Sequence, residues 1–324
     1  MIYEKKLKKS CIIIKMLSRA VQSIKTKKYG DEELIHDEHQ YIALIEDIIH
    51  KGDIVNGRNG KTHTIFGCSM HFSLENGKIP LLTTKKVAWK TCLKELLWFI
   101  SGSTNNDLLQ NQNVKIWNGN ASRDFLDSRG LTNLRENDLG PVYGHQWRHF
   151  NAEYNTCDDD YSGKGVDQLS WIIEQLKNPE QCYSRRLIMS AWNPCQIDEM
   201  ALPPCHVLVQ FNVLPGRKLS CSLYQRSGDV GLGVPFNIAS YSFLAHLIAK
   251  HCGLIAHEFI YNLGNCHIYD DHLESLSGQI ERKPHAFPRI TIKEVRNSID
   301  DYVVDDFEID NYQCHSQIKM NMRK

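Results

Sequence analysis

The chain has 324 residues, of which 42% are hydrophobic and 23% are charged, values that are ordinary for a globular protein and that exclude fibrous and disordered chains. Lys plus Arg and Asp plus Glu number 38 each, so the formal net charge is zero. A neutral chain is a poor candidate for tight, sequence-independent binding to nucleic-acid phosphates. No apolar run reaches the roughly 18 residues of a membrane-spanning helix, so we expect no membrane span.

The charge is concentrated at the N-terminus. Residues 1–28 carry nine Lys and Arg against the single acid Glu4, which gives about +8 there and leaves about −8 for the rest. We therefore expect a basic N-terminal extension over residues 1–38, most simply a solvated disordered tail; a presequence and a nuclear address are the alternatives.

The eleven cysteines indicate a reducing compartment. No two of them have C-x-x-C spacing, their number is odd, and the first thirty residues lack the pattern of a signal peptide. A cytoplasmic location with mostly buried, reduced cysteines follows, with the nucleus as the alternative.

Beyond the extension, apolar periodicity predicts the elements in chain order. Apolar residues at helical spacing predict four helices, over 41–49 with Gly52 as a stop, 87–100, 166–176 and 238–252. Apolar runs predict three strands: 186–192, 207–214 and 219–225. Polar, turn-rich composition predicts loops over 53–67 and 118–165.

Helices and strands mix without regular βαβ alternation, and no linker divides the chain. The pattern favours an α+β fold: a single large domain over residues 39–324, with a mixed β-sheet flanked by helices.

Three motif-like features carry no function. Gly60-Lys61-Thr62 resembles the end of a P-loop, but Val55 stands where that motif needs glycine. No G-x-G-x-x-G follows a strand, so a dinucleotide cofactor is not expected. Adjacent Cys-His pairs at 205, 266 and 314 point to opposite faces of a strand, so we expect no metal site.

Cys205 is the candidate nucleophile, because two prolines precede it and hold its backbone rigid. A buried, inert cysteine is the alternative. Four arginines lie in polar surroundings and suit a phosphate ligand, although each alone is also an ordinary surface ion-pair partner: Arg58, Arg185, Arg186 and Arg226. A guanidinium near Cys205 would lower the pKa of its thiol.

Long blocks of the chain are more specific than any short motif: KIWNGNASRDFLD, LGPVYGHQWRHF, AWNP, MALPPCH, LYQRSGD and GLGVPFNIASY. On these blocks the chain resembles the thymidylate synthase family from about His39 to the C-terminus. The resemblance implies reductive methylation of dUMP to dTMP, with 5,10-methylenetetrahydrofolate as both carbon donor and reductant, so that neither a metal nor NAD(P) is required.

The resemblance also implies four catalytic residues. Cys205 would add to C6 of the uracil ring and make C5 nucleophilic. Asn237 would read the pyrimidine, accepting from N3–H and donating to O4. Glu95 would handle protons near O4, and its apolar neighbours should raise its pKa. Tyr143 would assist removal of the C5 proton.

Binding residues carry over in the same way. The resemblance implies a homodimer with shared active sites, in which Arg185 and Arg186 reach the phosphate bound by the neighbouring subunit. The other residues implied for dUMP are Arg58, Cys205, His206, Arg226, Ser227, Gly228, Asp229, Asn237, His267, Ile268 and Tyr269. Those implied for the folate are Ile116, Trp117, Asp229, Leu232, Gly233, Phe236 and Arg323.

Three departures from the family pattern keep other functions open. Arg58 stands one position late in the phosphate loop, with Gly57 in the usual arginine place. Asn265 replaces a carboxylate before His267, and the chain ends in Arg323-Lys324, which would attract the anionic tail of the folate or lie in solvent. The alternatives are a pyrimidine nucleotide hydroxymethylase, expected to carry aspartate at position 237, and a non-catalytic RNA-binding regulator.

Overall fold

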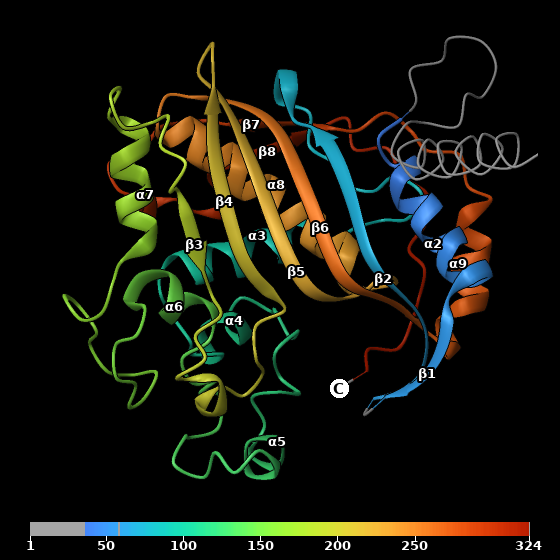
Figure 1. Cartoon of the computed structure of the whole chain (residues 1–324), viewed down its shortest axis with the longest axis horizontal. Helices are drawn as coiled ribbons and strands as arrows, with labels where there is room; N and C mark the ends of the chain where they lie inside the picture. Colours follow the sequence, from blue (N-terminus) through green and yellow to red (C-terminus); the bar gives the residue numbers. More distant parts are fainter. Residues whose placement is uncertain (1–35, 58, 324) are drawn as a thin grey trace, which may run out of the picture. The chain divides into compact units, whose positions relative to one another are not determined.

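A computed structural model describes residues 36–57 and 59–323 of the chain. Within these residues, six strands form one mixed sheet in the order β1–β2–β6–β5–β4–β3 (Figure 1). The six strands are β1 (Asp53–Gly57), β2 (Gly60–Ser73), β3 (Ile188–Ser190), β4 (His206–Leu214), β5 (Lys218–Asp229) and β6 (Ile255–Tyr269).

All neighbouring strands in this sheet are antiparallel except β5 and β6. A parallel pair needs a crossover, and helix α8 (Gly233–His251) supplies it. The sheet is therefore mixed, and the predicted α+β class is confirmed.

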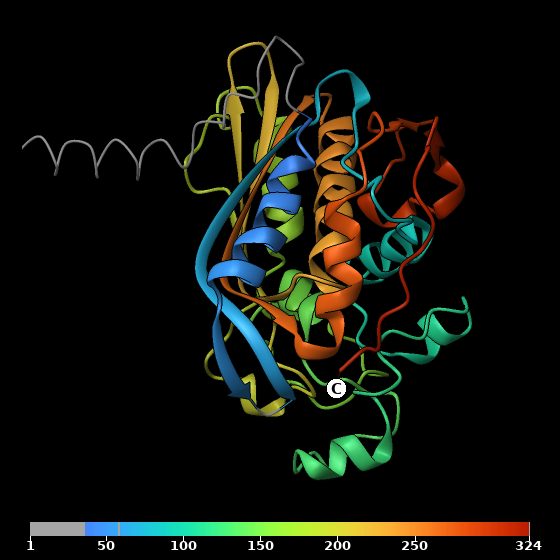
Figure 2. The same ribbon diagram turned by 90° about the vertical axis from the view of Figure 1, so that its right-hand side faces the viewer.

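Helices α2 (His39–Lys51) and α8 pack on one face of the sheet, with α9 (Leu273–Ile280) beside α2 (Figures 1 and 2). Nearly every side chain of α8 is buried, which matches a central helix with apolar residues on all sides. Between helices and sheet, Phe72, Tyr241 and Phe259 stack in the core. No described helix covers the opposite face.

The chain between β2 and β4 forms a second group of helices beside α8. Helix α3 (Trp89–Ile100) packs against both α8 and α6 (Tyr143–His149). The remaining elements are α4 (Asp107–Gln110), α5 (Arg123–Ser128), α7 (Gln168–Lys177), the hairpin of β7 (Arg289–Ile292) and β8 (Phe307–Asp310), and the 3₁₀ turns η1 (Glu75–Gly77), η2 (Ile197–Glu199), η3 (Asp270–His272), η4 (Ile299–Asp301) and η5 (Val304–Asp306).

One loop prediction is wrong, and a second holds only in part. Residues 53–67 form β1 and the first half of β2, a hairpin whose side chains are mostly exposed and polar, so hydrophobicity does not mark it. Residues 118–165 contain α5 and α6, and the segment from Asp138 to Trp147 is buried. Strand β6 was not predicted at all.

The folded body begins before the predicted boundary at His39. The backbone N–H of Ser73 donates to Asp37, and the Glu38 carboxylate is fully buried. The rest of the predicted basic extension, residues 1–35, lies outside the described residues. No helix in the described part of the chain is long and apolar enough to cross a bilayer.

Candidate active site

Cys205 lies just before β4, on the loop formed by Pro203 and Pro204, and its side chain is partly buried. Its backbone N–H donates to the Tyr143 hydroxyl at 2.8 Å, which joins the loop to helix α6. Burial raises the pKa of the Cys205 thiol, and the nearby Arg226 guanidinium partly offsets this rise. The expected guanidinium effect is therefore present, but burial outweighs it.

Arg226 of β5 holds the cysteine loop from the other side. Its guanidinium donates to the carbonyl oxygens of Pro203 at 2.8 Å and Pro204 at 2.9 Å. It also lies over the Trp192 ring, 5.6 Å from the ring centre. The positive charge predicted for the phosphate is thus fixed beside the candidate nucleophile.

Glu95 of α3 is buried next to this loop. Its carboxylate accepts a hydrogen bond from Trp117 Nε1 at 2.8 Å. Burial raises the pKa of Glu95 to about 7, in agreement with the pKa shift expected from its apolar neighbours. The Trp117 ring meets the Tyr143 ring edge-on at 6.1 Å, so Glu95, Trp117, Tyr143 and Cys205 form one connected group.

His206 and Asn237 form the adjoining wall. The His206 ring lies 5.1 Å from the Tyr143 ring, and its side chain lies near that of Asn237 of α8. Burial lowers the pKa of His206 to about 4, so the ring is neutral at pH 7. A neutral histidine beside the amide helps to fix the orientation of Asn237.

Asp229 ends β5 at the turn into α8. Its Oδ1 accepts from the backbone N–H groups of Gly231 at 2.8 Å and Leu232 at 3.2 Å. Gly233 lies between Asp229 and Asn237, because a Cβ at this position would be 3.8 Å from atoms of both. Four further predicted residues near these groups are partly or fully buried: Ile116, Trp117, Leu232 and Phe236.

The end of β6 runs alongside the end of β5, since Asp229 pairs with His267 in the parallel ladder. His267 Nδ1 lies 2.9 Å from Asn265 Oδ1. An amide oxygen only accepts, so Nδ1 carries the proton and Nε2 is left as an acceptor. Asn265 can therefore orient His267 as the usual carboxylate would. Ile268 is buried in the core.

Two predicted arginines lie apart from this group. Arg185 and Arg186 are exposed and line a hollow of about 380 Å³ with Glu180, Gln181 and Tyr183. No contact joins them to Cys205 within the described residues. The prediction for Arg58 lies outside the described residues.

Arg323 contacts protein carboxylates, and its predicted role toward the folate tail stays a prediction. Its guanidinium lies 2.9 Å from Asp271 and 3.5 Å from Asp270, and 5.8 Å from the centre of the Tyr269 ring.

Sequence reasoning missed two supports of the site. Lys85 is buried, its ammonium donates to the Gly231 carbonyl oxygen, and burial lowers its pKa to about 8 while Asp229 opposes the shift. No local pattern marks Lys85, because its partners lie far along the chain.

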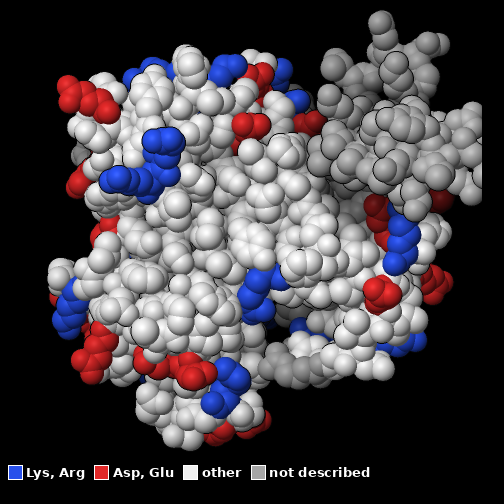
Figure 3. Space-filling model, viewed as in Figure 1, with Lys and Arg blue, Asp and Glu red and all other residues white. Residues whose placement is uncertain are grey.

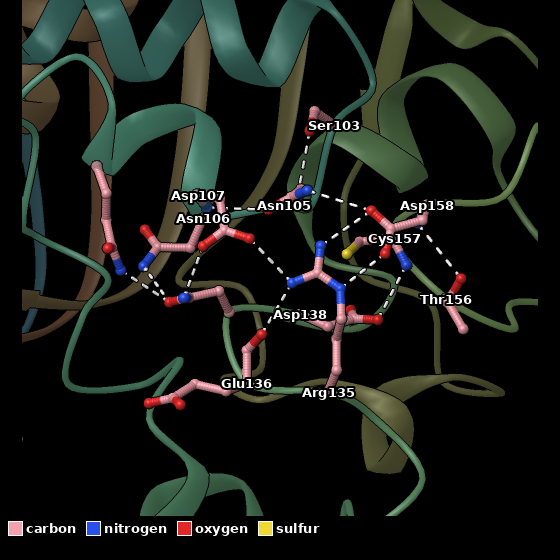
Figure 4. Close-up of polar contacts among 12 residues, drawn as sticks. Ser103, Asn105, Asn106, Asp107, Arg135, Glu136, Asp138, Thr156, Cys157 and Asp158 are labelled. Atoms are coloured by element: carbon pink, nitrogen blue, oxygen red, sulfur yellow. Dashed lines mark hydrogen bonds and ion pairs between the residues drawn. The ribbon is translucent and has the colours of Figure 1, made fainter.

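The second support is the buried Asp138, which accepts from the backbone N–H groups of Gly140 and Cys157, both at 2.9 Å. It thereby fixes the segment that leads to Tyr143. Figure 4 shows Arg135 beside it, bridging Asp107 at 3.0 Å and Asp158 at 2.7 Å. These ion pairs join the segment around Arg135 to the start of α4 and to the turn at Asp158.

The site thus joins a thiol, a buried carboxyl group, a phenol and an amide, with a fixed guanidinium beside the thiol. Within residues 36–57 and 59–323, no group of three His, Cys, Asp or Glu side chains could hold a metal ion. Such a set of groups is that of a covalent enzyme acting through a cysteine.

Comparison with known proteins agrees with this chemistry. The family model for thymidylate synthase matches residues 39–324. The chain is 52% identical over 290 residues to a bifunctional dihydrofolate reductase-thymidylate synthase of Leishmania amazonensis, covering 89% of the chain and 55% of the relative. It is 53% identical over 298 residues to a probable thymidylate synthase of Schizosaccharomyces pombe, covering 88% and 47% respectively. It is 50% identical over 297 residues to the thymidylate synthase of Saccharomyces cerevisiae, covering 88% and 97%.

The chain belongs to the thymidylate synthase family. It spans about half the length of the Leishmania and fission yeast relatives, and nearly all of the baker's yeast relative.

Proposed function

We propose that the chain converts dUMP to dTMP with 5,10-methylenetetrahydrofolate, as a thymidylate synthase. The observation that carries the proposal is the connected group of Cys205, Tyr143 and Glu95, with Arg226 bonded to the cysteine loop. Neither a thiol alone nor a buried glutamate alone would specify this chemistry.

The residues supply the steps that uracil requires. The Cys205 thiolate adds to C6, and the electron pair of the C5=C6 bond moves toward O4. Negative charge at O4 needs waiting donors, and Asn237 offers its amide N–H. Glu95, with a pKa of about 7, can both hold and release a proton near neutral pH. The Tyr143 hydroxyl accepts a hydrogen bond from the Cys205 backbone N–H, so it lies close to the nucleophile. There it can assist the later removal of the C5 proton.

The binding residues divide by chemistry. Arg226 and Ser227 suit the phosphate, and His267 and Tyr269 suit the ribose hydroxyl. Asp229, at the end of β5, suits the N–H groups of a pterin ring, and the neighbouring apolar side chains suit its faces. When bound, the folate would supply the one-carbon unit and the hydride.

We further propose a two-fold dimer. The sheet face that no described helix covers is largely free of charged residues in Figure 3. It exposes large apolar side chains on three different strands, Phe66, Ile188 and Tyr224, with exposed fractions of 82%, 44% and 39%. Exposed apolar surface of this kind is typical of an interface. A partner subunit on this face would also give Arg185 and Arg186 a phosphate to bind.

The test is a direct assay. Wild-type chain should form dihydrofolate from dUMP and methylenetetrahydrofolate, followed by absorbance, whereas Cys205→Ser should fold and lose nearly all turnover, because a hydroxyl is a weak nucleophile at pH 7. A 5-fluoro analogue of dUMP should form a covalent adduct that mass spectrometry places on Cys205. An adduct on another cysteine, or full activity of the serine variant, would refute the assignment.

The cytoplasmic location and the solvated N-terminal extension stay predictions. Imaging of a fluorescently labelled chain, with and without residues 1–35, would test the location.

A further inference from the structure

His272, in the turn η3 directly after β6, belongs to none of the roles assigned above. Its side chain is fully buried, and its ring meets the Tyr269 ring edge-on at 5.6 Å. A fully buried imidazole must satisfy its two nitrogens locally or leave one of them without a partner.

The two nitrogens face different parts of the molecule. Nε2 lies 2.8 Å from the backbone carbonyl oxygen of Asn321 in the C-terminal tail, and 3.9 Å from a carboxylate oxygen of Asp271. Because a carbonyl oxygen only accepts, Nε2 carries the proton. In the neutral ring, Nδ1 is then an acceptor. It lies 3.9 Å from Asp229 Oδ1 and has no hydrogen-bond partner among the described residues.

The glycine at position 231 shows how closely these groups converge. A Cβ on Gly231 would lie 3.0 Å from His272 Nδ1, 3.2 Å from Met320 Sδ and 3.3 Å from Asp229 Oδ1. The histidine, the tail and the proposed folate-binding aspartate therefore meet around one residue that has no side chain.

A second contact fixes the tail on the same turn but carries less weight. Arg323 pairs with Asp270 and Asp271, and its side chain is 37% exposed. Exposed ion pairs contribute little and are screened by salt. The hydrogen bond from the buried His272 ring is therefore the stronger of the two contacts that hold the end of the tail on this turn.

We propose that His272 is a positioning residue that places the C-terminal tail over Asp229, by donating from Nε2 to the Asn321 carbonyl oxygen. The proposal rests on the proposed function, in which Asp229 binds the folate. It assigns to His272 no contact with either substrate.

Two substitutions separate the effect of the Nε2–H donor from the effect of removing the imidazole ring. Gln at position 272 can place an amide N–H near the position of Nε2, whereas Asn reaches only as far as Nδ1. We expect His272→Asn to raise KM for the folate and to lower kcat, each by about tenfold, and His272→Gln to restore most of both. The dissociation constant of dUMP should change less than twofold in either variant.

His246 supplies a matched control. It is also buried and its Nε2 also bonds a backbone carbonyl oxygen, that of Lys78 at 2.9 Å, but it lies outside the site. His246→Asn should lower the melting temperature and leave KM for the folate unchanged. If His246→Asn and His272→Asn changed the kinetic constants equally, His272 would contribute only to general stability. That result would overturn the proposal.

A measurement without substrates separates this proposal from the proposed function. Carboxypeptidase should release residues from the C-terminus of His272→Asn about tenfold faster than from wild type or His272→Gln. Equal rates in all three proteins would overturn the positioning role even if the enzyme is active. A wild-type chain without synthase activity would refute the function, while the release rates still decide the role of His272.

Truncation after Met320 provides the last check. In that shortened chain the Asn321 carbonyl group is gone, so His272→Asn should cause no further rise in KM for the folate. If His272→Asn does not fold, NMR of the wild-type imidazole decides: its slowly exchanging Nε2–H resonance should disappear on the same truncation. Persistence of that resonance would contradict the contact.

Discussion

At the scale of single residues, the burial of Glu95 places an energetic constraint on the site. Its carboxyl group has one donor, Trp117, and otherwise lies among apolar side chains. A pKa of about 7 instead of 4.5 means that the ionised form is disfavoured in the folded state by about 3 kcal/mol, at about 1.4 kcal/mol per unit. The ionised form of Glu95 is therefore destabilised by burial, and the carboxyl group keeps its proton up to near neutral pH.

Glu95→Gln should separate stability from activity. Glu95 has a folded-state pKa above its unfolded value, so its stabilising contribution is fully present below about pH 4.5 and is lost as pH rises through about 7. The variant should therefore melt at a higher temperature than wild type at pH 8, and near the wild-type temperature at pH 5. Its turnover should fall by orders of magnitude. Calorimetric melts at both pH values test this, and a variant that is less stable at pH 8 would contradict the raised pKa.

Asn237 should decide which base is accepted. Asn237→Asp replaces an amide that both accepts and donates with a carboxylate that only accepts, so O4 of uracil loses its donor. We expect kcat/KM for dUMP to fall about a hundredfold, and the cytosine nucleotide, which offers an N4 donor, to bind more tightly. Steady-state kinetics with both nucleotides test this. An unchanged preference would mean that another group reads the base.

The residues of the site could be predicted only in part. Cys205 and Arg226 were candidates from their own surroundings, but their contact through the Pro203 and Pro204 carbonyl groups joins two strands and has no local signature. Lys85 escaped prediction for the same reason, because its partner Gly231 lies far along the chain. The chemistry of the site could be inferred from the long sequence blocks that the chain shares with the family. The positions of its residues depend on contacts between segments that are far apart in the sequence.

At the scale of elements, strong apolar periodicity was a reliable guide. Helices α2, α3, α7 and α8 lie where the spacing of apolar residues predicted them. Strand β6 was missed although it forms the centre of the sheet, since polar residues such as Asn262 and Asn265 interrupt its apolar run. The burial of its core-facing residues comes from neighbours that the local sequence does not specify.

Glu38 should be the most sensitive point at the start of α2. Its carboxylate accepts from the backbone N–H and the hydroxyl of both Thr83 and Thr84, at 2.6 to 3.0 Å. Glu38→Ala would leave the two backbone N–H groups and the Thr84 hydroxyl without this acceptor, so we expect a loss of about 3 kcal/mol of unfolding free energy. Urea denaturation measures the loss. Asp47→Ala, which removes an exposed ion pair with Lys51, is the control and should leave the unfolding free energy nearly unchanged.

At the scale of the whole molecule, the proposed dimer makes a complementation experiment possible. Arg186→Ala and Cys205→Ala homodimers should each be nearly inactive. If Arg186 serves the partner's site, a hybrid dimer holds one site with both lesions and one with neither. Mixed chains should therefore regain up to half of the wild-type activity per hybrid after subunit exchange. Inactive hybrids, with their formation verified by mass spectrometry, would contradict shared sites.

The order of the strands also bears on how the chain is made. Thr62 near the start of β2 pairs with Tyr269 at the end of β6, so β2 cannot complete its pairing until β6 has been synthesised. Until β6 has left the ribosome, β2 has an open edge, and Phe72 lacks its stacking partner Phe259 of β6. Pairings between such distant segments form slowly, and exposed strand edges promote aggregation. We therefore expect the nascent chain to need chaperone protection through most of its synthesis, and the sheet to close only once translation is nearly complete.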